Sequence, residues 1–432
     1  MKNFRSAFLI SIFIVIHIFV QKTVMAQETN WTHFRGSNLD GISADSLLPL
    51  TWSDTTNVVW KTEIRGKGWS SPVVYGDQVW VTTATPDGKE MSGICVGFQT
   101  GKLLFDVLLF KQDSIYGKHS INTYATPTPC IEDGFVYLNF GSSGTACVRT
   151  ADGTIVWKRD DYKVEHVQGT GSSPMIYKDF LILHYEGTDQ QFIVALNKKT
   201  GATIWRADRP KECYEALAPI GKKAYITPII INVGGKDLLI SNGAAVCIAY
   251  DVQTGTEVWR VVQGEDSTIA MPVYEDGVVF FYTSFVTPAE GEKYCELLAV
   301  DPKGSGDVTK TNVIWRVKSP MLQLLTPLIH DGIIYTVDSR NNLIAIDAKT
   351  GDTIYTKRLK NKYHASPVYA GGLVYFASVK GETLVLKAGR TPEIMAENQL
   401  PGEIYATPAI VQNSLIIRTE STLYRIGEKK CQ

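Results

Sequence analysis

Short apolar segments recur along the chain in pairs, and the two members of each pair are separated by residues that favour a tight turn. Each pair directly follows a proline that has a small or apolar residue before it, as in Ser71-Pro72-Val-Val-Tyr-Gly-Asp-Gln-Val-Trp80. Asp-Gly, Gly-Asp and Gly-Gly turns accept the positive φ of β-hairpins, and proline at the first strand position costs no ladder hydrogen bond. The pattern predicts a hairpin after each of eight prolines: Pro72, Pro129, Pro174, Pro228, Pro272, Pro327, Pro367 and Pro408.

A second turn signal follows most of these hairpins. It is Thr-Gly or Asp-Gly with an aromatic residue four positions after the glycine, as in Lys199-Thr-Gly-Ala-Thr-Ile-Trp205 and Gln253-Thr-Gly-Thr-Glu-Val-Trp259. This signal predicts a third and a fourth strand, with the aromatic residue on the fourth. In one copy an insertion, Lys303-Gly-Ser-Gly-Asp307, lengthens the turn. The repeating unit is therefore four antiparallel strands over roughly 45 residues, a period typical of propeller blades.

Eight such units predict an all-β protein, an eight-bladed β-propeller of four-stranded antiparallel blades. No helical pattern of 10–15 residues, as strand–helix repeats require, separates the copies. After Pro408 the chain lacks a fourth strand, whereas Asn57-Val-Val-Trp60 resembles one and precedes the first copy. We therefore expect residues 57–63 to complete the last blade and so close the ring. A seven-bladed ring is the alternative, if the lengthened hairpin after Pro228 is not a blade.

The first 26 residues differ from the rest. Lys2 and Arg5 precede an apolar run over residues 7–20, and Val24-Met25-Ala26 ends in small residues. This order is typical of a secretory signal peptide, and the run is short for a membrane anchor, which is the alternative. We expect a signal peptide at 1–26, a lead-in segment at 27–56 and the propeller at 57–432. The mature protein would then be periplasmic or secreted, without an integral membrane span.

Composition excludes several classes of protein and site. The 432 residues are 44% hydrophobic and 10% aromatic with a formal net charge of −1, which argues against disorder and against nucleic-acid binding. The seven cysteines are scattered, with no Cys-x-x-Cys pair, so neither a disulfide framework nor a zinc site is predicted. The first of them is Cys95, so no cysteine at the cleavage site offers a lipid attachment point, and we do not expect a lipoprotein. We also expect no metal ligands.

The outer-strand pattern carries a family resemblance. Ala249-Tyr-Asp-Val-Gln-Thr-Gly-Thr-Glu-Val-Trp259 and Ile344-Ala-Ile-Asp-Ala-Lys-Thr-Gly-Asp-Thr-Ile-Tyr355 resemble the docking repeats of quinoprotein dehydrogenases. The chain as a whole is similar to the pyrroloquinoline-quinone-like (PQQ-like) propellers and to the outer-membrane-protein assembly propellers. The first likeness implies a quinone beside a vicinal disulfide, with calcium held by carboxylate and amide ligands. No two cysteines here are adjacent, so we expect no cofactor, with PQQ and calcium as the alternative. The second likeness implies a scaffold that binds protein partners.

Candidate site residues come from the segments before the innermost strands, since these segments line one mouth of a propeller's central funnel. Their aromatic residues would stack on sugar rings, while their cations would pair with a carboxylate or sulfate. The alternative is that these side chains only fill the ring. The candidates are Arg65, Trp69, Lys118, His119, Tyr124, His166, Tyr225, His364 and Tyr405.

We expect an exported, non-catalytic binding or scaffold module for a glycan, in a polysaccharide-utilisation role, or for a protein partner, held at the funnel or rim. A carbohydrate-active enzyme is the alternative. It would be either a polysaccharide lyase in which a histidine or tyrosine removes a proton, or a quinone-dependent oxidoreductase. Whether the chain is an enzyme stays open at this point, and no catalytic residue is assigned.

Overall fold

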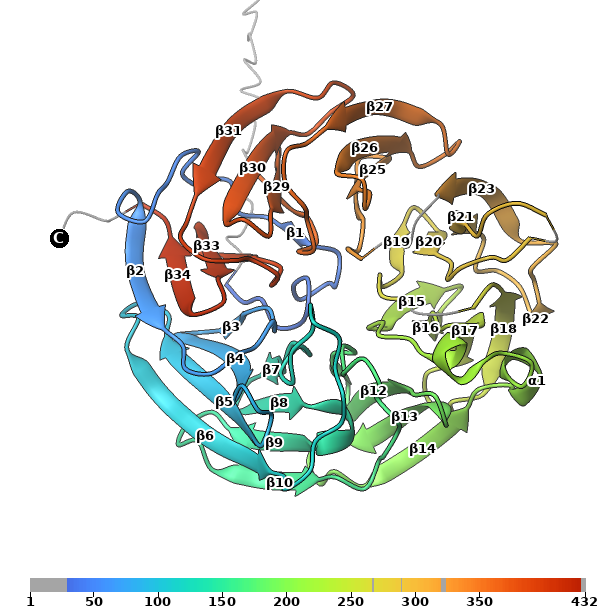
Figure 1. Ribbon diagram of the computed structural model, residues 1–432, viewed down its shortest axis with the longest axis horizontal. Coiled ribbons are helices and arrows are strands. Elements are labelled where there is room, and N and C mark those ends of the chain that lie inside the picture. Colours follow the sequence, from blue (N-terminus) through green and yellow to red (C-terminus); the bar gives the residue numbers. More distant parts are fainter. Residues whose placement is uncertain (1–28, 266–267, 289, 320–323, 429–432) are drawn as a thin grey trace, which may run out of the picture.

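The computed structural model describes residues 29–265, 268–288, 290–319 and 324–428. Eight sheets, each built on four antiparallel strands, are arranged around a central axis (Figure 1). The predicted all-β, eight-bladed propeller is confirmed. The expected signal peptide and Cys431 lie outside the described residues. No helix in the described part of the chain is long and apolar enough to cross a bilayer.

The blades follow the chain in order, each from the innermost to the outermost strand. Blade 1 contains β3 (Val73–Tyr75), β4 (Gln78–Ala84), β5 (Glu90–Gly97) and β6 (Leu103–Lys111). Blade 2 contains β7 (Cys130–Glu132), β8 (Phe135–Asn139), β9 (Thr145–Arg149) and β10 (Ile155–Arg159). Blade 3 contains β11 (Met175–Tyr177), β12 (Phe180–Glu186), β13 (Gln191–Asn197) and β14 (Thr203–Asp208). Blade 4 contains β15 (Ile229–Val233), β16 (Lys236–Ser241), β17 (Val246–Asp251) and β18 (Glu257–Val262).

The remaining blades continue this order. Blade 5 contains β19 (Val273–Glu275), β20 (Val278–Tyr282), β21 (Cys295–Val300) and β23 (Val313–Ser319). Blade 6 contains β24 (Leu328–His330), β25 (Ile333–Val337), β26 (Asn342–Asp347) and β27 (Thr353–Arg358). Blade 7 contains β28 (Val368–Ala370), β29 (Leu373–Ala377), β30 (Glu382–Lys387) and β31 (Ile394–Gln399). Blade 8 contains β32 (Ala409–Val411), β33 (Ser414–Arg418), β34 (Thr422–Ile426) and β2 (Val58–Glu63).

The ring closes where the sequence predicts. β2 pairs antiparallel with β34, with Lys61 opposite Tyr424, so the first long strand of the chain forms the outer edge of the last blade. The hairpin after Pro228 is β15–β16 of a complete blade, so the seven-bladed alternative is wrong. Closure by antiparallel pairing joins the two ends of the ring without a covalent bond.

Outer-strand tryptophans dock onto the next blade. The indole of Trp205 on β14 lies over Gly255 in the turn of blade 4 and donates its Nε1–H to the Val252 carbonyl at 3.1 Å. The glycine is required because its φ is +71° and a Cβ there would lie 2.6 Å from the indole. This contact explains why the repeat has a glycine in the turn and an aromatic residue on the outer strand.

The junction between blades 4 and 5 departs from this rule. The insertion in blade 5 forms β22 (Gly306–Asp307), which pairs parallel with β18 of blade 4, with Gly306 opposite Trp259. The Trp259 indole is fully buried, and its Nε1–H has no hydrogen-bond partner among the described residues. Main-chain pairing replaces the tryptophan dock at this junction.

The N-terminal segment is built into the ring. Trp31 bridges Val74 of β3, the Thr32 carbonyl accepts the Ile131 N–H at 2.9 Å, and β1 (Ile42–Ser43) pairs parallel with β28. Residues expected to be a lead-in therefore contact the inner strands of several blades.

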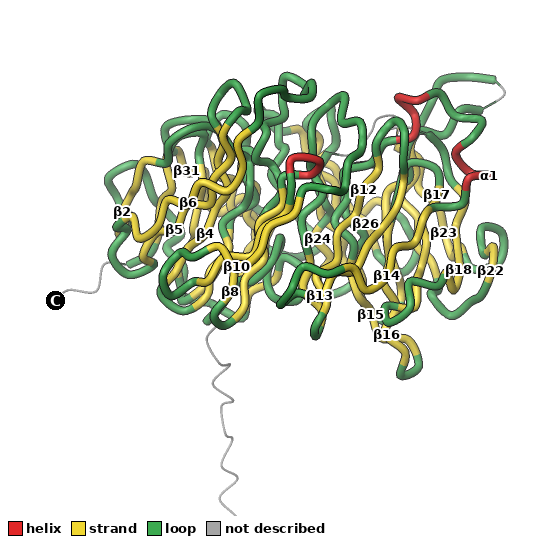
Figure 2. Tube along the Cα trace, turned by 90° about the horizontal axis from the view of Figure 1, so that it is seen from below, coloured by secondary structure: helices red, strands yellow, loops and turns green. Residues whose placement is uncertain are grey.

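Helices are confined to single turns. These are α1 (Lys211–Tyr214) and the 3-10 turns Gly141–Ser143 and Pro219–Lys222. The sequence predicts no helix between the blades, and α1 corrects this by one turn in the loop between β14 and β15 (Figures 1 and 2). Among the residues that the structure describes, no helix packs between two sheets, so the radial arrangement is unaffected.

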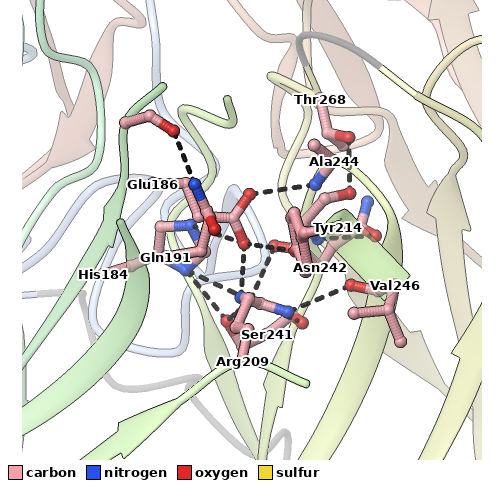
Figure 3. A network of polar contacts seen from close by, with 12 residues as sticks. His184, Glu186, Gln191, Arg209, Tyr214, Ser241, Asn242, Ala244, Val246 and Thr268 are labelled. Atoms are coloured by element: carbon pink, nitrogen blue, oxygen red, sulfur yellow. Dashed lines mark hydrogen bonds and ion pairs between the residues drawn. The ribbon is translucent and has the colours of Figure 1, made fainter. Parts of the chain in front are cut away.

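A buried ion pair in blade 3 is hydrogen-bonded to the loop between β16 and β17 of blade 4 (Figure 3). Glu186 and Arg209 contact each other with both side chains fully buried. The Tyr214 hydroxyl and the Ala244 N–H each donate to Glu186 at 3.0 Å. His184 on β12 is buried beside this pair. Its Nδ1 lies 3.0 Å from the Ser241 hydroxyl, but its Nε2 has no hydrogen-bond partner among the described residues. The network positions the loop between β16 and β17.

Candidate functional site

A cavity of about 400 Å³ opens around the axis, among the loops that precede the innermost strands. Those loops also carry α1, so the cavity lies on the face that bears the helical turns (Figure 2). Its lining residues come from the lead-in segment and from all eight blades. They are Phe34, Trp69, Ser71, His119, Ile121, Asn122, Thr126, Thr128, Gln168, Thr170, Gly171, Ser173, Tyr225, Thr227, Ile269, Phe285, Leu324, Thr326, His364, Ser366, Tyr405 and Thr407.

Seven hydroxyl side chains at the start of the inner strands form a ring, which we call the hydroxyl ring. Each of its members directly precedes one of the repeat prolines. In each linked pair, the backbone N–H of the residue in one blade donates to the hydroxyl oxygen in the next blade, at 2.9–3.1 Å. The members are Ser71, Thr128, Ser173, Thr227, Thr326, Ser366 and Thr407.

The hydroxyl ring is interrupted in blade 5. Met271 stands at the position that elsewhere holds serine or threonine, so the Thr227 N–H has no hydrogen-bond acceptor among the described residues. The other seven links explain why a hydroxyl residue precedes proline in the repeat, since each hydroxyl satisfies a buried N–H of the neighbouring blade. Serine or threonine before the proline is visible in the sequence, although the sequence analysis predicts only a small or apolar residue at these positions.

Aromatic rings form one wall of the cavity. Trp69 of the loop before blade 1 stacks on Tyr405 of the loop before blade 8, with ring centroids 4.3 Å apart. His364 meets Tyr405 edge to face at 5.1 Å. Burial, with a smaller effect of Lys362, lowers the pKa of His364 to about 4, so this ring is neutral at pH 7. The wall is uncharged and presents flat apolar surface.

Polar groups lie on the wall formed by blades 2 to 4. The Tyr225 hydroxyl donates to Gln168 Oε1 at 2.8 Å and accepts from Lys223 Nζ at 2.5 Å. His119 is exposed, and its Nδ1 accepts the Ile121 N–H at 3.3 Å. This wall therefore offers amide, phenol and imidazole groups.

Five of the nine predicted residues line the cavity and four do not. The lining members are Trp69, His119, Tyr225, His364 and Tyr405. The other four face elsewhere. Arg65 pairs with Asp106 on the outer strand of its own blade at 2.5 Å, and Lys118 lies over the Tyr124 ring at 5.6 Å. Sequence reasoning also missed Phe34, because nothing in the pattern brings a lead-in residue to the axis.

The last two predicted residues are buried against Tyr116, which lies in the loop between blades 1 and 2. Tyr124 packs against Tyr116, with ring centroids 5.8 Å apart, and His166 lies 5.2 Å from the same ring. The Ser142 N–H donates to His166 Nε2 at 3.3 Å, and burial lowers the pKa of His166 to about 4. Both side chains have the packing role that was the alternative for the candidate set.

The cavity does not fit a quinone held with calcium. A hard divalent cation needs several oxygen ligands that include carboxylates, and the described lining contains no aspartate or glutamate. No group of three or more His, Cys, Asp or Glu side chains suited to a metal occurs in the described ranges. We therefore derive no chemistry through that cofactor.

Comparisons with known proteins agree with the fold. The family described as outer membrane protein assembly factor BamB matches residues 189–309 and 296–390. A protein of that name from Nitrosomonas eutropha is 25% identical over 120 residues, which are 27% of this chain and 29% of that protein. Tetrathionate hydrolase from Acidithiobacillus ferrooxidans is 19% identical over 269 residues, 59% of this chain and 50% of that protein. The chain therefore spans half or less of the length of these relatives.

Among solved structures, BamB from Moraxella catarrhalis aligns with a TM-score of 0.58 at 13% identity, over 85% of this chain and 99% of that one. At this identity the likeness concerns the fold alone. Eight four-stranded blades, the outer-strand docking repeat and the family match lead to one conclusion. The chain is an eight-bladed β-propeller with PQQ-like repeats, similar to the BamB assembly factors over residues 189–390.

Proposed function

We propose that this chain is an exported, non-catalytic binding module that holds part of a glycan in its axial cavity. The observation that carries the proposal is the pairing of an aromatic wall, Trp69 with Tyr405, and a floor of hydroxyl groups in one cavity of about 400 Å³. The C–H face of a sugar ring packs on an aromatic surface, while its hydroxyls exchange hydrogen bonds with protein hydroxyl and amide groups.

Export is the second part of the proposal. It is supported by the basic, apolar and small-residue order of residues 1–26. The resemblance to proteins named for outer-membrane-protein assembly supports the same compartment. We expect a periplasmic or secreted protein, not a lipoprotein, whose mature N-terminus is Gln27, and N-terminal sequencing of the exported protein tests this.

Two other functions remain as outcomes of the test. A protein partner is favoured by the family match to assembly factors. A lyase acting on uronates is favoured by Tyr225, whose hydroxyl contacts the buried Lys223 amine at 2.5 Å. A phenol oxygen in the cavity lining is one of the groups that can serve as general base for C5 proton abstraction.

Glycan-array binding of the mature protein tests the proposal. We expect binding that Trp69→Ala abolishes, because this substitution removes half of the aromatic wall. Arg65→Ala is the matched control, since this residue lies in a neighbouring loop segment and pairs outward with Asp106. Binding unaffected by Trp69→Ala would contradict the proposal. Absorbance from an unsaturated product on incubation with uronate polysaccharides would replace it with the lyase.

A further inference from the structure

The hydroxyl ring carries unused hydrogen-bond donors. In each of its seven members the hydroxyl oxygen accepts a backbone N–H, which leaves the hydroxyl proton to be donated. None of these protons has an acceptor among the described residues, although each side chain is at least 96% buried and lines the cavity. A hydroxyl that already accepts a hydrogen bond is a stronger donor. The floor therefore favours a ligand that presents acceptor oxygens.

A buried cation lies beside one part of this ring. Arg35 is fully buried in the N-terminal segment, and its Nη atoms donate to the carbonyls of Pro327 and Pro367 at 3.0 Å and of Thr326 at 3.4 Å. These carbonyls belong to the start of the inner strands of blades 6 and 7. Its chain neighbour Phe34 lines the cavity.

The charge of Arg35 is not balanced by a direct ion pair. Arg35 reaches Asp40 through the backbone carbonyl, at 2.7 Å, whereas the Asp40 carboxylate accepts the Ile42 N–H. No ion pair within 4.0 Å forms at the guanidinium in the described part of the chain, and the Asp40 carboxylate acts on it only through a longer-range Coulombic interaction. Burial lowers the pKa of Arg35 to about 10, so the group is charged at neutral pH. Arg35 therefore places positive charge behind the Thr326 and Ser366 side of the floor. A second buried cation, Arg418, donates to the carbonyls of Thr82 and of Ser70, the residue before Ser71, but to the carbonyl of no described ring member.

We propose that the glycan is acidic, and that its carboxylate or sulfate group is held by the hydroxyls of Thr326 and Ser366, with Arg35 behind them. This deepens the proposed function and rests on it. Hydroxyl donors can hold an anion without a cation in the cavity lining, which has no lysine or arginine among its described members. This assignment differs from the sequence-based expectation that Arg65 or Lys118 pairs with the anion, because neither residue lines the cavity.

Matched ligands and matched variants test the inference. Methyl β-D-glucuronide and methyl β-D-glucoside differ only at C6, and the 6-sulfate of the glucoside gives the sulfate arm. Thr326→Val and Thr128→Val each remove one hydroxyl and leave one ring N–H without its acceptor, in blades that lie four positions apart. The two variants thus share the same structural cost and differ in their distance from Arg35. Thr326→Ser retains the hydroxyl and serves as the rescue.

Affinities are measured by titration with saturation-transfer NMR at neutral pH. We expect the glucuronide or the sulfate to bind about tenfold tighter than the glucoside, the effect of one charge-assisted hydrogen bond. Thr326→Val should remove this preference and Thr326→Ser should restore it. Thr128→Val removes a floor hydroxyl as well, so it should weaken the binding of acidic and neutral sugars alike and leave the ratio of their affinities within about twofold of the native value.

The results separate the two proposals. Equal affinity for the acidic and neutral sugars, with both lost in Trp69→Ala, overturns the acidic group and leaves the glycan cavity standing. If Thr326→Val and Thr128→Val reduce the preference for the acidic sugars equally, the acidic group is not held beside Arg35. Failure of all three sugars to bind overturns both the inference and the proposed function.

Discussion

The contacts between outer-strand tryptophans and turn glycines should stabilise the ring. Comparing alanine substitutions at two glycines measures the contribution of one such contact to the free energy of unfolding. Gly255 has a φ of +71° and Gly332 a φ of +69°. A Cβ at Gly255 would lie 2.6 Å from the Trp205 ring, whereas a Cβ at Gly332 would meet nothing within 4 Å. Alanine at either position therefore causes the same backbone strain, but only alanine at Gly255 collides with the Trp205 ring.

The magnitudes follow from these two contributions. The left-handed backbone costs an L-residue about 1–2 kcal/mol, which is the full expectation for Gly332→Ala. Overpacking against a buried ring adds about 1–3 kcal/mol, so Gly255→Ala should lower the free energy of unfolding by about 2–5 kcal/mol. The difference between the two variants measures the docking contact.

Urea unfolding monitored by far-UV circular dichroism is the assay, and the denaturant slopes of the variants must agree before midpoints are compared. In a Trp205→Ala background the cost of Gly255→Ala should fall to that of Gly332→Ala, because the collision has been removed. Two variants that differ by less than about 0.5 kcal/mol in the native background would refute the reasoning, since distant surface sites vary by this much.

Three further expectations concern buried polar groups. In urea unfolding, Trp259→Phe should lower the free energy of unfolding by about 1 kcal/mol less than Trp205→Phe does, because only the Trp205 indole N–H loses a carbonyl partner. Equal losses of stability would contradict the unpaired Trp259 indole. Glu186→Gln should lower the free energy of unfolding by about 3–5 kcal/mol, because it leaves Arg209 buried without its counter-ion, and a change below about 1 kcal/mol would contradict this. Burial holds the pKa of His33 at about 4, below its ordinary 6.5, so the unfolded chain binds more protons between these values and stability falls as pH drops through that window. His33→Gln should flatten this fall by about 3 kcal/mol, and an unchanged pH profile would count against it.

The sequence carried the blade count because its signals are local. Each signal depends on one turn or on one contact between neighbouring blades. The signals are proline at the first strand position, Asp-Gly at the hairpin tip and an aromatic residue four positions after glycine. The closing strand was predictable for the same reason, since the segment around Trp60 repeats the outer-strand pattern. The short helix α1 was missed because a single turn leaves no period to read.

The site was predictable only where the chain order fixes it. Trp69 and Tyr405 directly precede inner strands, so the topology alone brings them to the axis. His166 and Tyr124 occupy equivalent segments but are buried against Tyr116, which depends on loop conformation rather than on position along the repeat. Phe34 and Arg35 reach the axis through a segment outside the repeat, and no periodic pattern contains that information.

The most direct measurement is a crystal structure of the mature protein soaked with methyl β-D-glucuronide. The account predicts electron density for one sugar in the axial cavity, with its ring beside Trp69 and Tyr405 and its oxygens on the hydroxyl floor. A sugar bound on the outer rim, with the cavity holding only solvent, would contradict it.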